Sequence, residues 1–273
     1  MIEFPARDGR RLGGELFEPA APRACAIVAG AMAVPARFYG RYAEHLSRTG
    51  IAALTVDYRG IGWSRQGPVR ADPATFHDWG LQDLGGAVDF LVKRHPGLPL
   101  CWVGHSAGGQ LMGLLEDAPI ASALLVSSGS AWWRAYRGKP RAIIFGLFHA
   151  AIPAVVAASG YLPMRAFRQG EDVPGGVARE WAEWGRHPRY VRKYADPRGG
   201  LGFERYAGPL RAIAFRDDAY APPAAVEGLL SLYTRARKEL ILHDGPAGHF
   251  GFFKQPDLWR DPAFAVLRET NAA

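Results

Sequence analysis

Short apolar runs alternate with amphipathic segments along most of the chain, and this alternation restricts the fold more than any other feature. The apolar runs cover 24–30, 51–58, 99–103 and 121–127. Runs without polar alternation are typical of strands buried on both faces. Because strands that alternate with helices build parallel βαβ units, the sequence predicts an α/β protein with a mostly parallel sheet flanked by helices.

The segments between and around these runs complete the prediction. Helical patterns cover 37–48, 76–95 and 109–116, and a strand, helix and strand follow at 210–215, 224–233 and 239–243. At the N-terminus, 2–6 and 11–18 form a predicted hairpin, with Asp8-Gly9 as its turn. Ligands of such sheets bind at the carboxyl ends of the strands.

One long stretch interrupts the alternation. Residues 130–206 have no strand pattern and contain four tryptophans, Trp132, Trp133, Trp181 and Trp184. We expect a helical cap insertion within a single domain that covers 1–273. The apolar segment 142–164 is long enough to span a membrane. A pair of cap helices broken at Pro153 and Gly160 is the favoured interpretation.

A serine motif follows the third apolar run. The letters GHSAGG at 104–109 fit G-x-S-x-G, directly after a predicted strand and directly before a predicted helix. This setting is typical of a nucleophile elbow, in which the serine occupies a strained turn between strand and helix. The motif predicts Ser106 as a nucleophile; the alternative is an ordinary turn with a helix-capping serine.

A serine hydroxyl needs a histidine base, which a carboxylate orients. In elbow-containing hydrolases the chain order is serine, acid, histidine. Only His249 follows the last predicted strand in a loop, so it is the predicted base, whereas His105 is expected to point elsewhere. The acid should follow the strand at 210–215, where Asp217 and Asp218 are adjacent candidates. Neighbours in extended backbone point to opposite sides, so only one can face the histidine.

These motifs resemble the α/β-hydrolase superfamily, in its esterase- and lipase-like branch. Besides GHSAGG, the resemblance rests on DYRGIGWS at 57–64, RDDAYAP at 216–222 and AGHFGFF at 247–253, and it extends over nearly the whole chain. The insertion resembles the cap of a bacterial group of predicted hydrolases. The spacing to Pro222 resembles that after the acid of many relatives, which favours Asp218 over Asp217.

The resemblance also implies where an oxyanion would bind. One donor is the backbone N–H of Ala107, directly after the nucleophile. The other comes from the loop after 24–30, where counting back from Tyr39 to match relatives indicates Met32, with Ala31 as the alternative. This loop begins Gly-Ala-Met, whereas relatives usually carry His-Gly. Backbone donors do not depend on the side chain, so the difference does not exclude the function.

The implied activity is hydrolysis of a carboxylic ester through an acyl-enzyme, with an apolar acyl or aryl ester as the expected substrate. No cofactor and no metal ion are expected. Alternatives with the same three residues are an acyltransferase and, less favoured, an amidase or peptidase. A non-catalytic binding protein on the same fold is also less favoured, since such relatives usually lose one of these residues.

Charge and cysteine content bear on partners and location. The chain has 33 Lys and Arg against 26 Asp and Glu, a net charge of +7, without a recognisable nucleic-acid-binding module. We expect no nucleic-acid partner, and membrane-surface contact through Arg134, Arg137 and Lys139 is a minor hypothesis. Cys25 and Cys101 lie in apolar runs, which favours buried free thiols. With no signal-peptide pattern at the start, a cytoplasmic location is expected.

Overall fold

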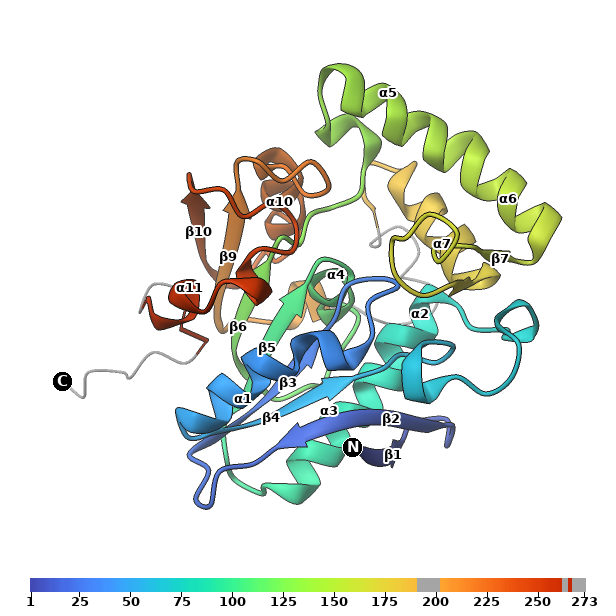
Figure 1. Cartoon of the computed structure of the whole chain (residues 1–273). Coiled ribbons are helices and arrows are strands. Elements are labelled where there is room, and N and C mark those ends of the chain that lie inside the picture. The colour runs from blue at the N-terminus through green and yellow to red at the C-terminus, as the bar shows by residue number, and fades with distance from the viewer. Residues whose placement is uncertain (191–201, 262–264, 267–273) are drawn as a thin grey trace.

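A single mixed sheet forms the centre of the computed structural model, which describes residues 1–190, 202–261 and 265–266 (Figure 1). Its strand order is β1-β2-β4-β3-β5-β6-β9-β10. Only β1 and β2 run antiparallel to their neighbours; the other strands are parallel. The strands are β1 (Ile2–Pro5), β2 (Arg11–Phe17), β3 (Ala24–Ala29), β4 (Ile51–Val56), β5 (Leu100–His105), β6 (Ile120–Val126), β9 (Pro209–Phe215) and β10 (Arg237–His243).

The central strands are buried along their whole length, as their uninterrupted apolar sequences predict. Every residue of β3, β4 and β5 is buried. Cys25 on β3 and Cys101 on β5 are both buried and free. The predicted α/β fold with a mostly parallel sheet is therefore confirmed.

Helices cover both faces of the sheet. Helices α1 (Gly40–Arg48) and α11 (Pro256–Arg260) contribute buried side chains to the apolar cluster on one face. Helices α3 (Gly85–Arg94), α4 (Ala107–Met112) and α10 (Pro223–Leu230) contribute to the cluster on the other face. This second cluster extends into the insertion, so the insertion and the sheet share one core.

Two predicted helices differ in detail from the observed ones. The helix predicted at 76–95 consists of α2 (Phe76–Asp78), a π-helical stretch η4 (Trp79–Leu84) and α3. The helix predicted at 109–116 instead begins at Ala107 and ends at Met112. It begins earlier because the amides of Gly109 and Gln110 both bond to the carbonyl of Ser106, which makes the elbow the first turn of the helix.

The insertion lies between β6 and β9, beyond the carboxyl ends of the parallel strands (Figure 1). The predicted absence of strands is wrong, because Tyr161–Leu162 (β7) pairs with Val173–Pro174 (β8); two residues are too few for an alternating pattern. Residues 191–201 of the expected cap lie outside the described residues. The other elements are η5 (Trp133–Ala135), α5 (Gly138–Gly146), η6 (Leu147–Ala151), α6 (Ile152–Ser159), α7 (Gly175–Gly185) and α9 (Gly202–Arg205).

The apolar part of the insertion is one long helix. The predicted break at Pro153 is wrong: α5, η6 and α6 continue from Gly138 to Ser159, and only Gly160 ends the run, with φ +82°. Pro153 has no N–H to donate, and the wider π-helical turn of η6 just before it accommodates this loss. Among the described residues, this is the one helix long and apolar enough to cross a membrane.

Candidate active site

Ser106 lies at the sharp turn between β5 and α4. Its φ of 51° and ψ of −112° are rarely adopted by a residue with a side chain, so the turn is strained. Its amide bonds to the carbonyl of Val126 on the neighbouring strand β6 at 3.1 Å, which ties the turn to the sheet. The half-buried serine thus has the strand–turn–helix setting that its sequence motif predicts.

Glycines allow this turn to form. A Cβ at Gly104 would lie 2.5 Å from the Cα of Gly109, and one at Gly108 would lie 2.1 Å from the carbonyl oxygen of Ala29. Both approaches are closer than atoms can come without displacement of the backbone. The glycines of the motif are therefore required for the close approach of α4 to β5 and β3.

The structure brings the predicted base and the favoured acid together. Nδ1 of His249 lies 2.9 Å from Oδ2 and 3.1 Å from Oδ1 of Asp218. The carboxylate, almost completely buried, also accepts the amides of Tyr220 and Ala221 at 2.8 and 3.0 Å. Burial alone would raise the pKa of Asp218, but the hydrogen bond and charge of His249, with a smaller contribution from the amide of Ala221, lower it below its usual range. Asp218 is therefore a carboxylate that fixes the orientation of His249.

Asp217 has a different position. Its carboxylate is exposed and accepts the amides of Ala247 and Gly248, at 3.1 Å and at 2.9–3.0 Å. These are the two residues directly before His249. Asp217, the less favoured candidate for the acid, therefore fastens the histidine loop to the end of β9.

His105 takes part in the site, although the sequence analysis expected it to point elsewhere. Its Nε2 lies 2.8 Å from the carbonyl oxygen of His249, and its Nδ1 lies 2.8 Å from the hydroxyl of Tyr39. A carbonyl can only accept, so Nε2 carries the proton and Nδ1 accepts from the tyrosine. Burial, with a smaller contribution from His249, lowers the pKa of His105 to about 3, so the ring is neutral.

The same tyrosine distinguishes the two oxyanion candidates. The amide of Ala31 donates to the hydroxyl of Tyr39 at 2.7 Å, so it is already used within the protein. The structure gives the amide of Met32 no acceptor among the described residues. The loop is held further along by the carbonyl of Ala33, which accepts the amide of Glu171 at 2.7 Å. Glu171 belongs to the insertion, so the insertion directly supports the loop beside the serine.

No sequence signal indicated the roles of Tyr39, His105 or Glu171, because each acts through residues far away in the chain. Tyr39 served only as a landmark for alignment, and His105 was seen as part of the serine motif. Their partners are visible only once β3, β5 and the insertion are assembled.

Comparison with known proteins agrees with this geometry. Residues 20–175, more than half of the chain, match the family described as serine aminopeptidase, S33. The chain belongs to this family. It is therefore a hydrolase with the α/β-hydrolase fold, as the motifs predict. Among curated proteins, none matches the sequence.

Solved structures of esterases and lipases share the fold of this S33 hydrolase. A soluble variant of monoglyceride lipase from Saccharomyces cerevisiae has a TM-score of 0.65 at 17% identity, with 97% of each chain covered. An esterase from Exiguobacterium antarcticum has a TM-score of 0.62 at 14% identity, covering 93% of this chain and 94% of the other. Est1E from Butyrivibrio proteoclasticus, with ferulic acid bound, has a TM-score of 0.57 at 18% identity, with 91% of each chain covered.

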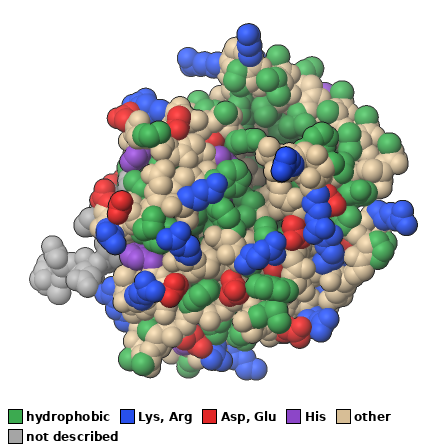
Figure 2. All heavy atoms as spheres, viewed as in Figure 1, with side chains coloured by type: hydrophobic (Ala, Val, Ile, Leu, Met, Phe, Trp, Pro, Cys, Tyr) green, Lys and Arg blue, Asp and Glu red, His purple; other side chains and the backbone are tan. Residues whose placement is uncertain are grey.

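A groove of about 370 Å³ adjoins the candidate residues of this S33 hydrolase. It is lined by Ala33 and Phe250, the residues directly after Met32 and His249, whereas Ser106, Asp218 and His249 do not line it. Figure 2 shows apolar and basic side chains around a hollow in this face. The lining residues are Ala33, Val34, Pro35, Arg37, Phe38, Arg168, Gln169, Gly170, Phe250 and Lys254.

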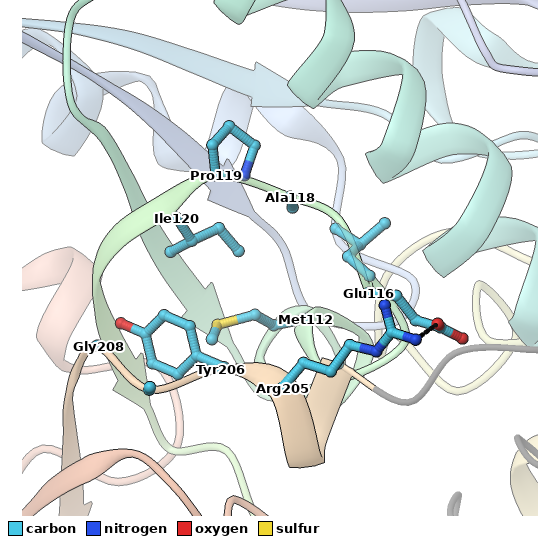
Figure 3. A pocket seen from close by; sticks show the side chains of 11 residues that line it. Met112, Glu116, Ala118, Pro119, Ile120, Arg205, Tyr206 and Gly208 are labelled. Atoms are coloured by element: carbon cyan, nitrogen blue, oxygen red, sulfur yellow. Dashed lines mark ion pairs between the residues drawn. The ribbon is translucent and has the colours of Figure 1, made fainter.

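A second hollow, of about 190 Å³, lies elsewhere (Figure 3). Met112 and Ile120 form part of its wall, and an ion pair of 3.3 Å between Arg205 and Glu116 lies at its side. It is at the end of α4 and the start of β6, the opposite end of the sheet from Ser106. Because it lies at the opposite end of the sheet from Ser106, it is not a substrate site for the same chemistry.

Proposed function

We propose that this S33 hydrolase cleaves carboxylic esters through an acyl-enzyme on Ser106. The observation that carries the proposal is the pair formed by His249 and the buried Asp218, together with the bond between the His249 carbonyl and His105, which precedes Ser106 on a strained elbow. The ring of His249 lies 5.0 Å from the ring of His105, the residue directly before Ser106. Because Asp218 occupies Nδ1, Nε2 of His249 is the atom available to take a proton.

The proposed reaction has two steps. In the first, Oγ of Ser106 attacks the acyl carbon while Nε2 of His249 removes the hydroxyl proton, and the same proton is passed to the leaving alcohol. In the second, His249 removes a proton from water, which attacks the acyl-enzyme and releases the acid. Asp218 stabilises the charged imidazolium in both steps and keeps its orientation.

Two backbone amides are proposed to bind the oxyanion. Ala107 begins α4 directly after the nucleophile, and its N–H is one of the donors that a helix start leaves without an intrahelical partner. Met32 is favoured over Ala31 as the second donor, because the amide of Ala31 already donates to Tyr39. Although this loop lacks the usual His-Gly sequence, the backbone N–H groups of Ala31 and Met32 are both present, because neither depends on the side chain.

An apolar acyl or aryl ester is the proposed substrate, and the groove supports it. Five of its ten lining residues are apolar side chains, from the segment after β3 and from Phe250, and three are basic. The four tryptophans of the insertion do not contribute to this groove. Trp184 is completely buried against Phe76 and His77, and none of the four lines the groove. With two free buried cysteines, we also propose a cytoplasmic location.

Labelling by a fluorophosphonate probe, with mass mapping of the modified residue, tests the nucleophile. We expect labelling at Ser106 in the unaltered protein and none in Ser106→Ala. Labelling at another residue, or equal labelling of the variant, would contradict the proposal. A series of p-nitrophenyl esters of increasing acyl length then tests the apolar groove, since turnover independent of chain length would contradict that assignment.

Product analysis separates the alternatives. An acyltransferase would transfer the acyl group to an added alcohol, amine or thiol rather than to water. An amidase or peptidase, which the description of the family raises, would release arylamine from acyl anilides at rates comparable to those of the matching esters. We expect free acid as the main product and esters to be cleaved faster than anilides.

A further inference from the structure

The long helix of the insertion, α5–α6, has an unusually exposed apolar surface. Over an 18-residue window of Gly138–Ser159 the mean hydropathy is 2.0, yet only 17% of that window is buried. Ile143 is 66% exposed and Phe145 is 42% exposed. Helices of this composition in soluble proteins are normally buried all round, and large exposed apolar surfaces mark sites of interaction.

One side of this helix is attached to the protein. Phe148, Ile152 and Val156, spaced four residues apart, are at most 1% exposed. Phe148 packs edge-on against Trp181 of α7, with ring centroids 4.8 Å apart. The helix is therefore held along this stripe, and Phe145 beside it also contacts Trp133, with ring centroids 4.9 Å apart. Most of its remaining surface faces outward, and in Figure 1 it is the outermost element of the insertion.

Within residues 118–170, which include the helix, all charged side chains have one sign. Residues 118–170 contain no Asp or Glu, and all six basic residues in this range are exposed: Arg134, Arg137, Lys139, Arg141, Arg165 and Arg168. Only Arg165 has a carboxylate partner among the described residues, Glu171 at 3.6 Å. Another exposed cation, Arg70, lies beside Gly160, where the helix ends. The apolar face thus has cations at both ends.

We propose that this face docks onto an anionic lipid surface, with the helix lying in the plane of the interface. Apolar side chains would enter the acyl boundary while the cations contact the lipid phosphates. The buried stripe favours this orientation over a spanning one, because spanning would expose Phe148, Ile152 and Val156 from the shared core. A second copy of the chain fits less well, since pairing two such faces would bring like charges together.

Docking in this orientation would place the insertion against the membrane. The inference does not depend on the proposed hydrolysis, because the surface does not include Ser106, Asp218 or His249. Binding can therefore be measured with Ser106→Ala as well as with the unaltered protein, and failure of one proposal is distinguishable from failure of the other.

Co-sedimentation of the full chain with vesicles tests the docking. We expect binding to vesicles of phosphatidylcholine mixed with phosphatidylglycerol to exceed binding to pure phosphatidylcholine by more than about tenfold, since each basic residue near an anionic surface contributes roughly fivefold. Raising the ionic strength should reduce the difference. Absence of binding to the anionic vesicles at low ionic strength would overturn the proposal.

Matched variants locate the surface. The triple change of Arg137, Lys139 and Arg141 to Gln should lower binding more than about tenfold. The same change of Arg235, Arg237 and Lys238, exposed cations at the start of β10, should lower it much less. An equal loss in both would overturn the proposal in favour of attraction by the net charge alone.

Apolar contact is tested in the same way. Ile143→Asp with Phe145→Asp should abolish binding, whereas Val92→Asp with Leu242→Asp, at residues 38% and 39% exposed elsewhere, should not. Circular dichroism checks that each variant is folded. If the first pair instead converts an oligomer into a monomer, and the unaltered protein does not bind vesicles, the face is an interface between copies and the proposal is wrong.

Discussion

The imidazole of His105 holds the main-chain carbonyl of His249, with Nε2 and the oxygen 2.8 Å apart. His105 directly precedes the candidate nucleophile, so this bond connects the serine elbow to the backbone of the candidate base. On its other side the ring accepts from Tyr39, whose oxygen accepts from Ala31 beside the proposed oxyanion donor. Three segments of the site are thus connected by one buried chain of hydrogen bonds.

Removing the hydroxyl of Tyr39 should loosen all three segments. Tyr39→Phe leaves the amide of Ala31 and Nδ1 of His105 without partners in a buried region, so we expect a loss of about 1–3 kcal/mol in the free energy of unfolding, together with a lower kcat. Chemical denaturation and steady-state kinetics measure both. Tyr42→Phe on the same side of the sheet is the control, because no hydrogen bond to that hydroxyl is found among the described residues. Equal losses in the two variants would contradict the role of Tyr39.

The buried neutral His105 should make stability depend on pH. The pKa of the folded state is lowered to about 3, whereas an unfolded histidine takes up a proton below about 6.5. The unfolded state therefore binds the extra proton between these values. The contribution of the neutral His105 to the free energy of unfolding is fully present above pH 6.5. It is lost, at up to about 1.4 kcal/mol per pH unit, as the pH falls toward 3.

Denaturation at several pH values tests this dependence. Between pH 6.5 and 4, the free energy of unfolding of His105→Gln should decrease less steeply than that of the unaltered protein. His149→Gln, at an exposed position, should decrease as steeply as the unaltered protein. If the slope of His105→Gln matched that of the unaltered protein, His105 would not be the titrating group.

The two adjacent aspartates should differ sharply in their effect on turnover. Asp218→Asn removes the carboxylate that orients His249, so kcat should fall by about four orders of magnitude. Asp217→Asn keeps an oxygen that can accept from the loop amides, so we expect at most about a tenfold loss, mainly through a less rigid loop. Ester hydrolysis kinetics decide between them, and the reverse order of effects would assign the acid to Asp217.

The strain at Ser106 should be measurable as stability. Ser106→Gly and Ser106→Ala both remove the hydroxyl, but only glycine adopts a φ of 51° with a ψ of −112° without steric cost. We expect the free energy of unfolding of the glycine variant to exceed that of the alanine variant by about 1 kcal/mol. The greater flexibility of glycine in the unfolded chain opposes this gain and reduces it. Thermal denaturation of the two variants makes the comparison, and a more stable alanine variant would show that the turn is not strained.

The sequence by itself determined the sheet architecture and the place of the elbow. Both depend on local properties: uninterrupted apolar runs form buried strands, and small residues around Ser106 permit the turn. The loop position of His249 followed for the same reason, because it lies directly after a recognisable strand.

Only the tertiary structure decided how the polar groups are paired. Three hydrogen bonds show this: Asp218, not Asp217, pairs with His249; the amide of Ala31 donates to Tyr39; and His105 donates to the carbonyl of His249. Each of them joins residues that are separated in the chain. Hydrogen bonds need atoms within a few tenths of an ångström of a set distance, and a sequence pattern does not specify positions so finely.

The long helix of the insertion shows the same division. Its apolar composition is evident in the sequence, but composition alone does not distinguish a helix buried in a protein core from one that contacts a membrane. Its exposure depends on what the rest of the fold places against it. The fold buries only the stripe of Phe148, Ile152 and Val156 completely and leaves most of the rest of the helix partly or fully exposed.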